Sequence, residues 1–268
     1  MESDDDSGTD GRLGIQSVEV GAQVLQALVT AGRAVPLKEL ARLSGMHPGK
    51  VHRYLVSLTR TGLVAQDPIS GPYGVGPMAI ALGLTGLRST DLFRLASSEL
   101  PRLRDTIDET VILVIWNSGG PVVVDIEESA RPVYMNIRVG SILPAVRSAA
   151  GAVLAAFMPA DLVAPILAAE RKAAGPGNPL YQLASIETLF AQVRADRLAT
   201  AEGLLVNGVN AIAAPVFDHK GRIVAAIGAL GRSEELVVAR DGPIAVRLSE
   251  VARQMSGRLG FAGDGKAV

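Results

Sequence analysis

The stretch that decides the fold of the N-terminal part is LKELARLSGMHPGKVHRYLVSLTRTGLV, residues 37–64. It predicts a short helix, a three-residue turn at 44–46, and a second helix of about a dozen residues that ends at Gly62. Pro48 suits the first turn of that second helix, because a missing N–H costs nothing there. Two helices joined by a tight turn that contains a glycine, here Gly45, are typical of a helix-turn-helix.

The second of these helices, 47–60, has two different faces. At 3.6 residues per turn, Val51, Leu55 and Leu58 face inward, with Tyr54 at the margin. The opposite half has three cations and no acid; its members are Gly49, Lys50, His52, Arg53, Val56, Ser57 and Arg60. One helix fits the major groove of DNA, where Lys and Arg tips reach guanine acceptors or phosphates. The DNA-binding residues that we predict are His47, Gly49, Lys50, His52, Arg53, Tyr54 and Ser57, with Tyr73 from the segment that follows.

Three other interpretations of this helix are open. His47 and His52 could bind a metal, but they are five residues apart and sit poorly on one helix face. Either histidine could serve catalysis, yet no nucleophile or acid lies at a matching position. The outer half could also be an ordinary solvated face. The helix-turn-helix context favours DNA recognition over all three.

The surrounding sequence extends the motif in both directions. A helix precedes it at 17–31, with Ser17 as the expected N-cap and Gly32 as the end. After it, the segment 63–75 predicts a hairpin, the wing, because the turn-rich DPISGP separates LVAQ from YGV. Two further helices are expected at 77–87 and 90–109; Thr90 or Asp91 would cap the second, and Pro101 would kink it or mark its start.

From residue 110 the pattern changes to strands grouped with helices, which indicates an α+β domain with an antiparallel sheet. The predicted elements are strands at 110–116, 121–128 and 132–139, a small-residue helix at 148–158, mostly helix over 159–202, a hairpin of strands 209–217 and 222–230, and a closing helix at 242–260.

Composition and charge suggest four segments. Residues 1–10 carry five acids and no cation, and residues 11–80 carry seven Lys or Arg against three acids. A basic module behind an acidic tail suggests a polyanionic partner for that module. The segments that we expect are a disordered acidic tail at 1–14, a winged helix-turn-helix domain at 15–80, linker helices at 81–109 and a second domain at 110–262. The chain has no Cys and no long apolar run, so we expect a cytoplasmic protein without a membrane segment.

Over residues 15–260 the chain resembles the IclR family of bacterial transcription regulators. The resemblance rests on IQSVEVGAQVLQAL, the stretch quoted first, PYGVGPMAIALG, ETVILVIW, VGSILPAVRSAAGAVLAAFMP and GVNAIAAPVFDHKGRIVAAIGALG, in this order and spacing. It implies a winged helix-turn-helix, a linker helix and a GAF/profilin-like effector-binding domain. It also implies a homodimer or homotetramer that binds a double-stranded DNA operator, as a repressor, under the control of a small organic molecule.

The chain departs from the family pattern at both expected sites. The family's basic-Ser-Thr start of the DNA-binding helix is Pro48, Gly49 and Lys50 here, and the usual cation beside Tyr73 is missing. In the effector pocket, the polar positions of relatives become an amide and three apolar groups. The effector-binding residues that the resemblance implies are Arg147, Ser148, Ala149, Ala150, Asn207, Ala211, Gly228 and Leu230.

Such a pocket favours an apolar or aromatic effector over a compact carboxylate. Backbone N–H groups at Ala149 and Ala150 could still bind an anion at a helix start, and Arg147 could pair with a carboxylate. Two alternatives stay open: these positions pack as core without a ligand, and Arg147 is an exposed surface arginine.

Three functions can therefore be weighed. The first is a ligand-responsive DNA-binding regulator, and the second is a DNA-binding regulator whose C-terminal domain only oligomerises. An enzyme is disfavoured, because residues 110–260 contain one histidine, His219 in a hairpin turn, and no G-x-S-x-G or phosphate-binding loop. We expect no catalytic residue, no cofactor and no metal.

Overall fold

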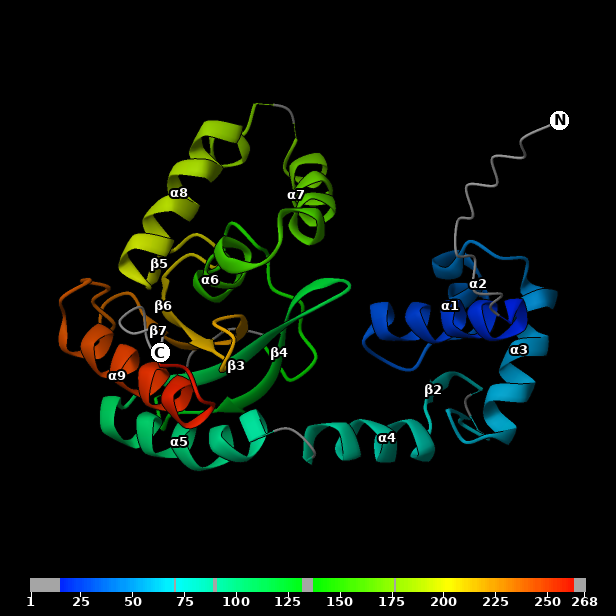
Figure 1. Ribbon diagram of the computed structural model, residues 1–268. Helices are drawn as coiled ribbons and strands as arrows, with labels where there is room; N and C mark the ends of the chain where they lie inside the picture. Colours follow the sequence, from blue (N-terminus) through cyan, green and yellow to red (C-terminus); the bar gives the residue numbers. More distant parts are fainter. Residues whose placement is uncertain (1–14, 70, 89–90, 132–136, 176, 263–268) are drawn as a thin grey trace, which may run out of the picture. The chain divides into compact units, whose positions relative to one another are not determined.

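The computed structural model describes residues 15–69, 71–88, 91–131, 137–175 and 177–262 (Figure 1). The expected disordered tail at 1–14 and the expected cap Thr90 lie outside these residues. The chain forms two compact units that divide after Ser89. The helix α5 (Asp91–Ile107), which we expected in the linker, belongs to the second unit. None of the helices in the described ranges is long and apolar enough to span a bilayer.

The first unit is a winged helix-turn-helix, as the sequence predicts. Its elements are α1 (Gln16–Ala31), α2 (Leu37–Ser44), α3 (Pro48–Arg60), β1 (Val64–Gln66), β2 (Tyr73–Val75) and α4 (Pro77–Arg88), and β1 pairs antiparallel with β2. Gly45 ends α2 with a left-handed φ of 67°, which a residue without a side chain adopts readily. The expected cap Ser17 is wrong: α1 begins one residue earlier, and Ile15 precedes it without a side-chain cap.

The second unit is built on a five-stranded antiparallel sheet in the order β4-β3-β7-β6-β5. Besides α5, its elements are β3 (Thr110–Asn117), β4 (Gly120–Glu127), α6 (Ala149–Phe157), α7 (Ala160–Ala174), the 3-10 helix η1 (Pro179–Tyr181), α8 (Leu183–Asp196), β5 (Ala199–Glu202), β6 (Val209–Phe217), β7 (Ile223–Arg232) and α9 (Pro243–Arg258). The two predicted hairpins, β3–β4 and β6–β7, are confirmed.

Three details of the second unit differ from the sequence predictions. Residues 199–202 form β5, an edge strand paired with β6, where mostly helix was expected. Most of the strand expected at 132–139 lies outside the described residues, and 137–139 are not in a strand. Pro101 lies inside α5, which excludes the start of the helix and leaves the kink as the remaining expectation.

The sheet separates two layers of helices (Figure 1). Alternate residues of β3 enter different cores: Ile112 and Val114 pack with α6 and α8, whereas Val111 and Leu113 pack with α5 and α9. Such alternation is the two-residue period of a strand that is buried on both faces.

The strand β5 pairs only with residues 210–213 of β6, so the outer edge of residues 214–217 has no partner strand. There the N–H of Phe217 donates to the buried Ser256 hydroxyl on α9 at 3.0 Å. The next N–H, that of Asp218, points to the other side of the strand and donates to the carbonyl of Arg222, the residue before β7.

The helix α6 is buried along nearly its whole length, which its small residues permit. Every residue from Ala149 to Ala156 is buried. The helix starts at the N-cap Ser148, whose hydroxyl accepts a hydrogen bond from the Gly151 N–H at 3.0 Å and donates one to the Pro144 carbonyl at 2.6 Å. A side chain at Gly151 would overlap that carbonyl oxygen and would lie 2.6 Å from the Ser148 hydroxyl. Glycine is therefore required for the preceding loop to pack against the helix.

Gly151→Ala should destabilise the second unit even though alanine is the better helix former. The added methyl group forces the loop away from α6, at a cost of about 1–3 kcal/mol. Gly257→Ala in α9 is the matched control, because open space surrounds that position, and it should be neutral or stabilising. Thermal unfolding followed by circular dichroism compares the two; equal melting temperatures would contradict the close approach.

Candidate functional site

The outer face of α3 is exposed and cationic, and it forms the first candidate site. Val51 and Leu55 are fully buried, and Leu58 and Tyr54 are half-buried, as predicted for the inner face. Lys50, His52, Arg53, Val56, Ser57 and Arg60 are all exposed. Within the described residues, no carboxylate pairs with any of the three cations. Three unneutralised positive charges on one helix face form a surface that attracts an anion.

His47 has a structural role at the start of this helix. It is the N-cap of α3, and its Nδ1 accepts a hydrogen bond from the Gly49 N–H at 3.2 Å. A methyl group at Gly49 would lie 3.4 Å from the same nitrogen, so glycine leaves the cap undisturbed. No cluster of His, Cys, Asp and Glu in the described part of the chain could hold a metal ion.

Tyr73 does not belong to this surface. It is only 7% exposed and packs in the core of the first unit with Val35 and Val64. Its backbone forms a two-way pair with Val35, at 3.0 and 2.8 Å. The prediction that Tyr73 contacts DNA therefore has to be corrected. Its aromatic ring stabilises the wing from inside. The tyrosine that stays partly accessible is Tyr54 on α3.

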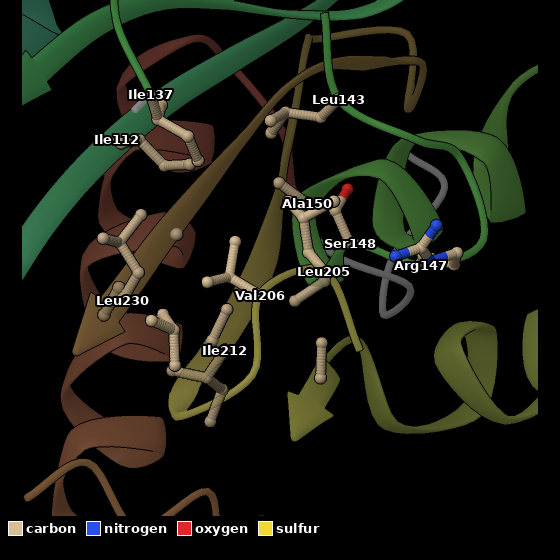
Figure 2. A pocket seen from close by; sticks show the side chains of 16 residues that line it. Ile112, Ile137, Leu143, Arg147, Ser148, Ala150, Leu205, Val206, Ile212 and Leu230 are labelled. Carbon is tan, nitrogen blue, oxygen red and sulfur yellow. The ribbon is translucent and has the colours of Figure 1, made fainter. Parts of the chain in front are cut away.

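The second candidate site is a pocket in the second unit, between the start of α6 and the sheet (Figure 2). It contains about 430 Å³ of empty space including its mouth, and little of that space is wide enough for a water molecule. The space is therefore narrow. Most of its lining is apolar; the lining residues are Ile112, Ile137, Leu143, Arg147, Ser148, Ala149, Ala150, Ala201, Leu205, Val206, Val209, Ala211, Ile212, Gly228, Ala229 and Leu230.

Seven of the eight predicted effector-binding residues line this pocket. The exception is Asn207, which is exposed on the loop between β5 and β6 and does not reach the lining. The loop contributes Leu205 and Val206 instead. These apolar residues carry no chemical signal in the sequence, and only the folded loop brings them to the pocket.

The polar groups of the pocket gather at the start of α6. The Ser148 hydroxyl is already engaged with Pro144 and Gly151. Arg147 donates from Nε to the Leu204 carbonyl at 3.0 Å, which holds its guanidinium beside the pocket (Figure 2). The N–H groups of Ala149 and Ala150 belong to the first turn, where backbone donors lack helical acceptors.

The floor of the pocket depends on Gly228 of β7. A methyl group there would lie 3.2 Å from Cγ1 of Ile112 and 3.5 Å from the Ile212 carbonyl oxygen. Because Gly228 has no side chain, space for the pocket remains above β7, between the neighbouring strands β3 and β6. The site as a whole combines an apolar interior with a cationic rim, which suits a small, mostly apolar molecule that carries one polar end.

Comparison with known proteins places both sites in one family. The sequence profile described as "Bacterial transcriptional regulator IclR C-terminal" matches residues 84–257, and the one described as "IclR helix-turn-helix domain" matches residues 17–68.

Individual relatives agree with these profiles. The chain is 26% identical over 251 residues to the DNA-binding transcriptional repressor YiaJ of Escherichia coli, covering 92% of this chain and 89% of the other. It is 37% identical to HmgR of Pseudomonas aeruginosa, whose crystal structure superposes with a TM-score of 0.59, covering 93% of this chain and all of the other. An IclR homologue from Microbacterium hydrocarbonoxydans, crystallised with 4-hydroxybenzoate, shares the fold at 20% identity and a TM-score of 0.71, with 91% and 98% coverage. The chain belongs to the IclR family of DNA-binding transcriptional regulators.

Proposed function

We propose that this protein is a repressor that binds its operator through the outer face of α3 and is controlled by a small, apolar or aromatic effector in the pocket beside α6. The observation that carries the DNA-binding part is the exposed, unneutralised cation set of α3. Lys50 and Arg53 lie in its first two turns, the part of a recognition helix that contacts base edges. Arg60, at the other end, suits a phosphate.

Lys50→Ala and Arg53→Ala should each weaken operator binding by about 1–3 kcal/mol if these residues contact bases. The operator can be selected from random duplexes with the wild-type protein, and affinities can be measured by mobility shift. Lys172→Ala, which removes an exposed cation from α7, should leave the affinity unchanged. Wild-type affinity in both α3 variants would contradict this assignment of the DNA-binding face.

The apolar lining supports the choice of effector class. A compact oxyacid would find few groups in this lining to replace its hydration, chiefly Arg147 and two backbone amides. An aromatic ring would bury against Ile112, Leu230 and their neighbours. The 4-hydroxybenzoate bound by the Microbacterium homologue is a molecule of this class. A second function is favoured by the narrowness of the pocket: the domain could serve oligomerisation alone, without a ligand.

A thermal-shift panel separates the two. Aromatic monocarboxylates such as 4-hydroxybenzoate should raise the melting temperature more than pyruvate does, since a ligand at a hundred times its Kd stabilises the fold by about 2.7 kcal/mol. Ala211→Leu fills the pocket from β6 and should abolish the shift while the protein stays folded. A panel without any stabiliser would favour the oligomerisation function.

A homodimer through the first unit is also part of the proposal. The helix α4 has no charged residue before Arg88, yet Met78, Ile80, Leu82 and Leu84 are 51%, 53%, 61% and 46% exposed. An apolar helix that is open to water favours association. A second copy of the same helix is the partner that fits a helix-turn-helix protein, because such proteins bind paired half-sites as symmetric dimers.

Leu82→Glu should shift the protein toward smaller species and weaken operator binding, because it places a charge in the proposed interface. Val237→Glu, at a position that is 70% exposed in the second unit, is the control and should leave the mass unchanged. Sedimentation velocity measures both. An unaltered distribution for Leu82→Glu would show that α4 is not the dimer contact.

A further inference from the structure

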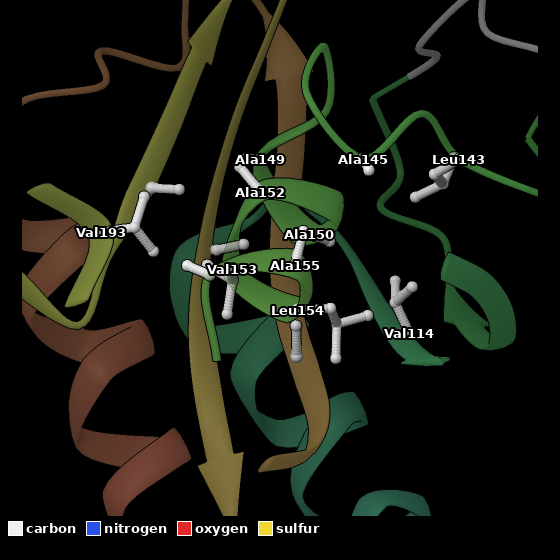
Figure 3. Close-up of a cluster of buried hydrophobic side chains, with 14 of the residues drawn as sticks. Val114, Leu143, Ala145, Ala149, Ala150, Ala152, Val153, Leu154, Ala155 and Val193 are labelled. Carbon is white, nitrogen blue, oxygen red and sulfur yellow. The ribbon is translucent and has the colours of Figure 1, made fainter. Parts of the chain in front are cut away.

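The segment 143–148 forms the side of the pocket where its polar groups lie. Leu143, Arg147 and Ser148 line the pocket. Between them, Ala145 and Val146 are buried and Pro144 is half-buried. Figure 3 shows Leu143 and Ala145 beside the first turns of α6. The Leu143 N–H donates to the Pro121 carbonyl at 2.8 Å, which ties one end of the segment to β4, and the Ser148 cap ties the other end to α6.

The middle of the segment is held by a carboxylate from a different element. The buried N–H groups of Ala145 and Val146 donate to Oε1 and Oε2 of Glu170, at 2.5 and 3.4 Å. Glu170 lies on α7, and its Oε2 also accepts a hydrogen bond from the Tyr181 hydroxyl of η1 at 3.3 Å. One carboxylate therefore joins α7, η1 and the pocket segment.

These bonds are of the kind whose loss is costly. A hydrogen bond to an ionised acceptor is roughly twice as strong as one between neutral groups, and a buried N–H without a partner costs the full desolvation of that group. Tyr181 is itself buried, which raises the pKa of its phenol, and the nearby Glu170 carboxylate raises that pKa further. The helix α7 also packs on the core through the buried Val163 and the partly buried Ile166 and Leu167. The carboxylate adds a polar attachment to these apolar contacts.

We propose that Glu170 is a positioning residue for the effector pocket: it fixes the segment that places Arg147 and Ser148, and it thereby couples α7 and η1 to ligand binding. The inference rests on the proposed effector function.

Glu170→Gln tests the attachment in the full-length protein without any ligand. A carboxamide offers one acceptor oxygen and one NH2 group, so one of the two segment N–H groups would face a donor. Hydrogen exchange of peptides that cover residues 142–148 should become about tenfold faster. Glu187→Gln on α8, an exposed glutamate, is the matched control and should exchange as wild type. Unaltered exchange in Glu170→Gln would overturn the inference.

Ligand affinity separates positioning from a merely structural role. For the acid that stabilises the wild type in the thermal-shift panel, with 4-hydroxybenzoate as the first probe, calorimetry should give a Kd about five- to tenfold weaker for Glu170→Gln and unchanged for Glu187→Gln. Tyr181→Phe keeps both segment bonds, so its loss should be smaller. Faster exchange with unaltered affinity would overturn the positioning role alone, whereas a wild type that binds none of the acids would contradict the proposed effector function.

Discussion

The approach of the Pro144 carbonyl to the first turn of α6 is the contact on which the second unit depends. The Ser148 hydroxyl bridges the loop and the helix, and Gly151 leaves the space that the carbonyl oxygen occupies. With its start fixed in this way, a helix of alanines lies directly on the sheet and against α8. The first turn of α6 also places the backbone N–H groups of Ala149 and Ala150 beside the apolar pocket. The packing requirement and the binding site are thus consequences of a single loop-to-helix junction.

Local signals explain why so much of the fold follows from the sequence. The helix-turn-helix has Gly45 at a left-handed turn and an inner stripe of Val51 and Leu55, and both hairpins of the large sheet have turn residues between apolar runs. Seven pocket residues were found because the resemblance located the start of α6 and the ends of the strands. What the sequence could not supply are contacts between distant segments.

The differences from the predictions illustrate this limit of local patterns. The strand β5 has four residues and follows Arg197, which has a left-handed φ of 50° and ends α8; no pattern in so short a run distinguishes a strand from a helical turn. Tyr73 is buried because β2 pairs back onto Val35, a contact across almost forty residues. Asn207 is exposed, and the apolar Leu205 and Val206 of the same loop line the pocket in its place. The carboxylate of Glu170 acts on a segment 25 residues earlier.

The part of the β6 edge that has no partner strand bears on how the protein avoids aggregation. Alternate N–H groups of a strand point to opposite edges, so Pro215 shares the outer edge with Phe217 and has no N–H to offer there, while the N–H of Phe217 is bound to Ser256. An invading strand would find neither donor. Proline and occupied donors are common means by which proteins prevent edge-to-edge pairing. The second unit therefore carries protection against edge-to-edge association within its own sheet.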